Sequence, residues 1–185
     1  MKKTIEFLGR PLFVFITWCL LTGISWLILE ACKLTANIFL LVALNFILFF
    51  GTMAYGFFYF HAFPLHRISS SYYRSKEIES LRFYRALGVE WFRKRLINSP
   101  FKKLNQRVYL KGRKAYIQAF HEETKRSETS HLIGLFIGLF FTIVFLIHEN
   151  MVAFIASLFF NGVMNFYPIL LQRYNRIKIS PQELD

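Results

Sequence analysis

The sequence predicts an all-α integral membrane protein with about four transmembrane helices and a basic cytoplasmic amphipathic segment between the second and third. Hydrophobic residues make up 55% of the 185 residues, yet the formal net charge is +12. A soluble domain of this size could not bury so much apolar surface. A membrane protein can carry both properties, because apolar spans face lipid while basic residues stay in the loops. The chain is expected to form one membrane domain with three parts: residues 1–64, 65–130 and 131–185.

Residues 1–64 are expected to form a hairpin of two spans. The first runs from Pro11 to Leu29, about 19 residues or roughly 29 Å of helix, which matches the hydrocarbon thickness. No small-residue cleavage site follows it, which favours a retained span over a signal peptide. A polar turn, Glu30–Asn37, leads to the second span, Ile38–Phe60, which ends in aromatic residues typical of the membrane interface. Pro64 then stops the helix.

Residues 65–130 form a basic segment with sixteen Lys or Arg against six Glu. Apolar and aromatic residues recur at helical spacing, for example Leu87 and Trp91, which indicates amphipathic helices on a membrane surface. A helix is expected to resume near Lys114 and to run into the third span. Such a segment could attract anionic lipid headgroups or a nucleotide-bearing acyl donor. No nucleic-acid-binding motif accompanies the charge, so a nucleic-acid partner is not expected.

Residues 131–185 are expected to form the second hairpin and a basic tail. The third span is His131–Ile147, His148–Asn150 form a tight turn, and the fourth span is Met151–Leu171. Gln172 begins the tail. Of the 23 Lys and Arg, only Lys33 lies on the side of the two short turns. The positive-inside rule therefore predicts a multi-pass protein of the cell (inner) membrane, with both termini and the central segment in the cytoplasm.

Glu128 and His131 are three residues apart and would share one face of a helix. A carboxylate beside an imidazole can orient it and raise its basicity, so the pair could remove a proton from a hydroxyl group. A polar helix end that meets water and headgroups explains the same residues without chemistry. Glu-x-x-His is also a spacing of di-metal sites. Such sites need a second copy, which the sequence lacks, so no metal is predicted.

Two further polar groups lie in or after the fourth span. Arg173 and Arg176 could hold a phosphate through charge-assisted bonds, or could simply cap a span with positive charge. Asn161 and Asn165 are four residues apart and form a polar stripe within the span. Polar residues at such depth face another helix or a cavity rather than lipid.

These two stretches together carry a family resemblance. The run Glu123–His131, followed by Asn165, Pro168 and Gln172–Arg176, resembles the glycosyl-4,4'-diaponeurosporenoate acyltransferase family, which is associated with the last step of staphyloxanthin carotenoid synthesis. The resemblance covers roughly Phe83 to Lys178, and the N-terminal hairpin departs from it. It implies a small membrane enzyme that esterifies a sugar hydroxyl of a glycosylated carotenoid, or a similar membrane glycolipid, with a fatty acyl chain.

The resemblance also implies roles for single residues. His131 would be the general base, oriented by Glu128. Cationic side chains at the membrane face would bind donor phosphates or stabilise the oxyanion, namely Lys125, Arg126, Arg173 and Arg176. Asn165 and Gln172 would hydrogen-bond the acceptor sugar. The expected partners are a glycosylated isoprenoid or other membrane lipid and an acyl donor such as acyl-coenzyme A, with no resident cofactor. The alternative is a non-enzymatic membrane protein that binds anionic lipid or a partner complex through its basic segment.

Overall fold

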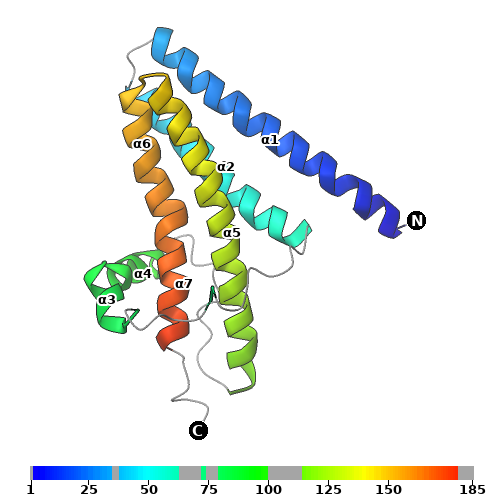
Figure 1. The fold of residues 1–185 in the computed structure, drawn as a ribbon, viewed down its shortest axis with the longest axis vertical. Coiled ribbons are helices and arrows are strands. Elements are labelled where there is room, and N and C mark those ends of the chain that lie inside the picture. Colours follow the sequence, from blue (N-terminus) through cyan, green and yellow to red (C-terminus); the bar gives the residue numbers. More distant parts are fainter. Residues whose placement is uncertain (1, 35–37, 63–71, 74–78, 100–113, 179–185) are drawn as a thin grey trace. The chain divides into compact units, whose positions relative to one another are not determined.

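The computed structural model describes residues 2–34, 38–62, 72–73, 79–99 and 114–178, and every regular element in these ranges is helical (Figure 1). The order is α1 (Lys2–Leu34), α2 (Ile38–Ala62), α3 (Leu81–Ala86), α4 (Val89–Ile97), α5 (Lys114–Ile147), α6 (Met151–Asn161), the π-helix η2 (Gly162–Phe166) and α7 (Tyr167–Lys178). Within the described residues, 3 helical stretches are long and apolar enough to cross a membrane, and α1 contains a shorter apolar stretch, Phe15–Glu30. The all-α membrane architecture with about four spans is therefore confirmed.

The chain forms two compact units. The first, here called the apolar unit, consists of Met1–Leu65 and Ser130–Phe166. The second, here called the basic unit, consists of His66–Thr129 and Tyr167–Asp185.

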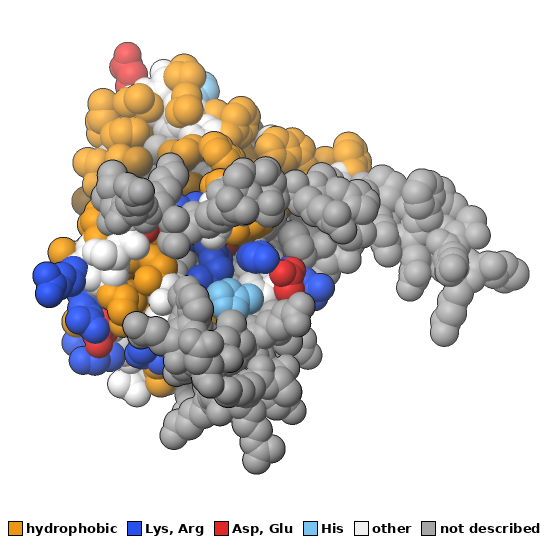
Figure 2. All heavy atoms as spheres, turned by 60° about the horizontal axis from the view of Figure 1, so that its bottom comes forward, with side chains coloured by type: hydrophobic (Ala, Val, Ile, Leu, Met, Phe, Trp, Pro, Cys, Tyr) orange, Lys and Arg blue, Asp and Glu red, His pale blue; other side chains and the backbone are white. Residues whose placement is uncertain are grey.

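The apolar unit packs α1, α2, α6 and the second half of α5 around a core of large side chains that includes Ile28, Leu48, Phe49 and Phe145. Its outer surface is also apolar. Phe39 is 88% exposed, and Phe136 and Ile155 are each 64% exposed. Exposed hydrophobic side chains gather in the upper part of Figure 2. A helical unit that is apolar both inside and outside is suited to lipid rather than to water.

The helical run of the fourth span extends beyond its predicted end. It continues through the π-helix to Lys178, so the residues predicted to begin the basic tail, Gln172–Arg176, are helical. Pro168 lies inside this continuous helical run, where its missing backbone N–H leaves a carbonyl of the preceding turn without an intrahelical partner. The π-helix immediately before it supplies the local adjustment. The prediction that a helix resumes near Lys114 and runs into the third span is confirmed by α5.

The basic unit contains α3, α4, α7 and the first half of α5. The Ser80 hydroxyl caps α3 by accepting a hydrogen bond from the Phe83 amide at 3.2 Å. Gly88 then adopts a positive φ of 75° and starts α4, so the amphipathic segment is broken into two short helices at this glycine. A small core of Tyr84, Val89, Leu171 and Tyr174 joins α3 and α4 to α7. This packing holds the polar face of α7 in place.

Candidate functional site

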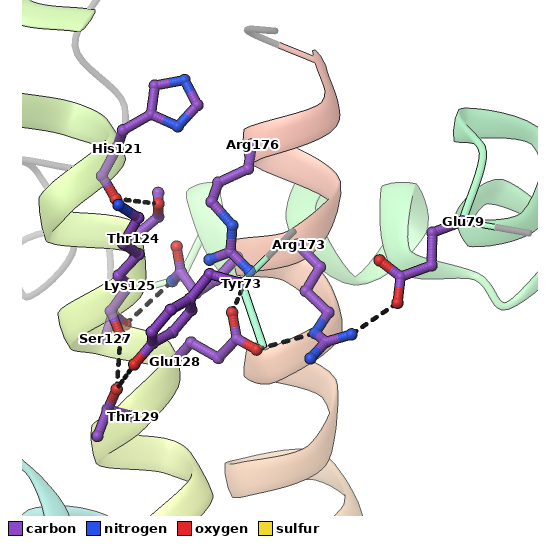
Figure 3. Close-up of polar contacts among 11 residues, drawn as sticks. Tyr73, Glu79, His121, Thr124, Lys125, Ser127, Glu128, Thr129, Arg173 and Arg176 are labelled. Atoms are coloured by element: carbon purple, nitrogen blue, oxygen red, sulfur yellow. Dashed lines mark hydrogen bonds and ion pairs between the residues drawn. The ribbon is translucent and has the colours of Figure 1, made fainter. Parts of the chain in front are cut away.

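Glu128 is the centre of a buried chain of ion pairs in the basic unit. Its side chain is fully buried, and its Oε1 atom accepts from Arg173 Nε at 2.8 Å. Its Oε2 atom accepts from Arg176 Nη2. Arg173 also donates through Nη1 to Glu79 Oε1, at 2.6 Å (Figure 3). Two carboxylates and two guanidinium groups balance one another, which is the condition under which charges tolerate burial.

Two tyrosines lie against this chain. The Arg173 guanidinium carbon is 4.8 Å from the centre of the Tyr72 ring, and that of Arg176 is 5.6 Å from the Tyr73 ring. Both are cation–π contacts. The Tyr73 hydroxyl is also hydrogen-bonded to the Thr129 hydroxyl. Burial, aided by the negative charge of Glu128, raises the pKa of both tyrosines above its usual value, so both phenols are protonated and able to donate at neutral pH.

The face of α7 that carries Arg176 holds two side-chain amides. Gln172 donates through Nε2 to the Ser127 hydroxyl at 3.1 Å. Among the described residues, three buried polar atoms of this face have no hydrogen-bond partner: Gln172 Oε1, Asn175 Nδ2 and Arg176 Nη1. Sequence reasoning missed Asn175. Its position three residues after Gln172, on the same helical face, was the available signal.

His131 and Asn165 lie in the apolar unit. The Asn165 side chain is fully buried and donates to Asn161 Oδ1 at 2.8 Å and to the Thr52 hydroxyl at 3.3 Å. The His131 ring lies close to the Met164 backbone and the Asn165 side chain. Its Nδ1 atom is buried and has no partner within the described part of the chain. The π-helix that contains Met164 and Asn165 is a local geometry often found at functional sites.

Two glycines on α5 leave room for the side chains of Asn161 and Asn165. A Cβ atom at Gly134 would lie 2.4 Å from Asn165 Oδ1, and one at Gly138 would lie 2.6 Å from Asn161 Oδ1. Asn161 also donates to the Leu135 carbonyl at 3.2 Å. The stripe therefore faces another helix, as small residues at close helix contacts in membranes allow. Sequence reasoning missed the matching spacing of the two glycines.

The remaining cationic residues of the predicted site are on the surface of α5. Lys125 is paired with Glu122 at 2.8 Å, and Arg126 with Glu123 at 4.0 Å. Exposed pairs of this kind contribute little to stability and exchange easily with other anions. Figure 2 shows basic, acidic and histidine side chains together on the face that it presents. No group of three or more His, Cys, Asp or Glu that could hold a metal occurs within the described ranges.

The structure thus divides the predicted site residues between the units. Glu128, Gln172, Arg173 and Arg176 are in contact within the basic unit, whereas His131 and Asn165 belong to the apolar unit. The roles that the sequence suggested for these residues stay predictions.

A family model described as glycosyl-4,4'-diaponeurosporenoate acyltransferase matches residues 69–181, more than half of the chain. The chain belongs to this family. The resemblance drawn from the sequence is thereby confirmed, and the chain belongs to a family of membrane acyltransferases of carotenoid biosynthesis. Comparison with curated proteins and with solved structures gives no match. The matched region includes the ion-pair chain around Glu128 and the polar group of His131, Asn161 and Asn165. It does not include Thr52, α1 or α2.

Proposed function

We propose that this protein transfers a fatty acyl chain to a sugar hydroxyl of a glycosylated carotenoid or a similar membrane glycolipid. The observation that carries the proposal is the family match over residues 69–181. That region contains His131 and the whole buried chain from Glu79 to Arg176. Burying several charged and polar groups together is expensive in free energy, which supports a functional reason for them.

In the proposed reaction His131 is the general base. It takes the proton of the acceptor hydroxyl while the hydroxyl oxygen attacks the carbonyl carbon of an acyl thioester such as acyl-coenzyme A. The tetrahedral intermediate then expels the thiolate, and the imidazolium returns the proton to that sulfur. The products are the acylated sugar and a free thiol, so no oxidant or external base is needed.

The roles proposed for the other site residues follow from the contacts that each side chain makes. Arg126 is exposed and Lys125 is partly exposed, and both cations lie on the surface of α5, so they are proposed to meet the phosphates of the donor. Arg173 is occupied by two carboxylates, and Glu128 by two arginines. We therefore assign both to positioning. Asn165, which lies beside His131, is proposed to hold that ring, and Gln172 to bind the acceptor sugar.

The protein is proposed to lie in the cell membrane with both termini and the basic unit on the cytoplasmic side. Trp91 on α4 is 63% exposed, and the Arg95 guanidinium lies 5.4 Å from its ring centre. An exposed indole beside cations suits an interface rich in anionic lipid. The same surface supports the second candidate function, a non-enzymatic protein that binds anionic lipid or a partner complex.

Comparative lipid extraction tests the proposal. Lipids would be compared by mass spectrometry between cells with the gene, without it, and with the variants His131→Ala and His148→Ala. The second variant is a matched control, because His148 is an exposed histidine in the turn after α5. An acylated glycolipid should vanish in the deletion and in His131→Ala, with its unacylated precursor accumulating, and should persist in His148→Ala.

Two results would count against the proposal. Near-normal product in His131→Ala, at normal protein level, would rule out His131 as the base. An unchanged lipid profile in the deletion, under conditions in which the wild-type protein is present, would favour the lipid-binding alternative.

A further inference from the structure

Three neighbouring side chains of α7 bury polar atoms that no described residue satisfies. Gln172, Asn175 and Arg176 are 3%, 6% and 7% exposed, and each has one unpaired atom. Residues at spacings of three and four occupy one face of a helix. Buried polar atoms without partners are destabilising, so three together indicate that this face of α7 takes a polar partner that the described residues do not supply.

The charges around this face argue against an anionic ligand. Arg176 is paired with Glu128, which also binds Arg173, and Arg173 in turn binds Glu79. The chain of four groups therefore sums to zero charge. Lys125, the nearby cation on α5, is paired with Glu122. Among these described groups, a phosphate would approach two carboxylates with no cation left unpaired to offset them.

The unpaired atoms match hydroxyl groups instead. A side-chain amide offers a donor and an acceptor, and the free Nη1 atom of Arg176 is a donor. A sugar hydroxyl both donates and accepts, so adjacent hydroxyls can satisfy all three side chains, whereas a fully ionised phosphate can only accept.

Two of the three side chains, those of Gln172 and Arg176, are also held in place before any ligand binds. Gln172 is bonded to Ser127. Arg176 is fixed by Glu128 and lies on the Tyr73 ring, and Figure 3 shows its side chain directed from α7 toward Glu128. Groups that are fixed in advance lose little conformational freedom on binding.

We propose that Gln172, Asn175 and Arg176 form a subsite for the sugar of the acceptor lipid, with Asn175 as a binding residue. The inference rests on the proposed function for the identity of the sugar-bearing lipid. It gives Arg176 a role with the sugar rather than with donor phosphates.

Binding to the purified full-length chain tests this directly, in a detergent without a sugar headgroup. The probes are a short-chain alkyl glucoside and an alkyl phosphate of the same chain length, each below its micelle concentration. Wild-type protein should bind the glucoside more tightly than the phosphate. Asn175→Ala and Gln172→Ala should each weaken glucoside binding by about tenfold, the loss expected for one buried hydrogen bond. Lys178→Ala, an exposed position on the same helix, should leave binding unchanged.

The possible results separate this inference from the proposed function. Equal or tighter binding of the alkyl phosphate by wild-type protein would overturn the sugar subsite and favour a donor site. Glucoside binding that survives Asn175→Ala and Gln172→Ala together would also overturn it. If a variant fails to fold, the comparison of glucoside and phosphate binding by wild-type protein still tests the subsite. Because binding is measured without catalysis, selective glucoside binding supports the subsite even if the lipid profile shows no acyl transfer. Where transfer does occur, Asn175→Ala should raise the KM for the glycolipid and leave the KM for the acyl donor unchanged.

Discussion

Replacing Glu128 by leucine should destabilise the basic unit more than any other single change in its ion-pair chain. The Glu128 carboxylate is fully buried and is bound by both Arg173 and Arg176. In Glu128→Leu, Arg173 keeps its contact with Glu79, but Arg176 is left without a carboxylate partner among the described residues. A guanidinium group would then be buried with its charge uncompensated.

The size of the effect follows from this geometry. Removing one partner of a buried ion pair costs about 3–5 kcal/mol. For a chain of this size each kcal/mol shifts the melting temperature by roughly 2–4 °C, so Glu128→Leu should lower it by about 6–20 °C. Arg176→Met should cost less, because Glu128 would still be held by Arg173. The double variant should lose less unfolding free energy than the two single variants lose together, because it removes both buried charges.

Thermal unfolding of the detergent-purified protein, followed by intrinsic fluorescence, measures all four members of this cycle. Glu90→Gln is the matched control, because the pair of Glu90 with Arg85 at 3.3 Å is largely exposed, and it should shift the melting temperature little. A change of less than about 2 °C in Glu128→Leu would refute the assignment of Glu128 as the buried link. Strictly additive single and double variants would refute its coupling to Arg176.

Three further results are expected. Gly134→Ala should destabilise the apolar unit by about 1–3 kcal/mol, because its methyl group would lie 2.4 Å from Asn165 Oδ1. The loss would be measured as a lower melting temperature. Gly23→Ala is the control and should cause no such clash, because nothing lies within 4 Å of the added methyl group. Burial raises the pKa of Tyr84 to about 12, so stability present below about pH 10 should be lost as the pH rises toward 12. A denaturation series against pH should show that loss in wild-type protein and a flatter profile in Tyr84→Phe. Fluorescence of Trp91, with the other tryptophans replaced by phenylalanine, should be quenched by lipids brominated near the headgroup; equal quenching by deeply brominated lipids would contradict an interfacial α4.

The sequence alone determined the fold class, because the length and hydrophobicity of an apolar run are local properties. A run that matches the thickness of the hydrocarbon core can be recognised without knowledge of tertiary contacts. The four apolar runs and the tight turn at His148–Asn150 could be read from composition. The family could also be predicted, since the run Glu123–His131 and the run Gln172–Arg176 carry it within the matched region. The sequence did not show that the helical run of the fourth span continues to Lys178, because the π-helix before Pro168 is set by local backbone geometry that a propensity rule does not include.

Only the tertiary structure decided which polar residues meet. Sequence spacing paired Glu128 with His131, since residues three apart share a helical face. The structure shows that Glu128 is bonded to Arg173 and Arg176, which are 45 and 48 residues away. It likewise seats Asn161 and Asn165 against Gly138 and Gly134, and it leaves Asn175 with an unpaired buried amide. Partners so distant along the chain are selected by how helices pack and by the cost of burying a charge alone, and neither is visible in a local pattern.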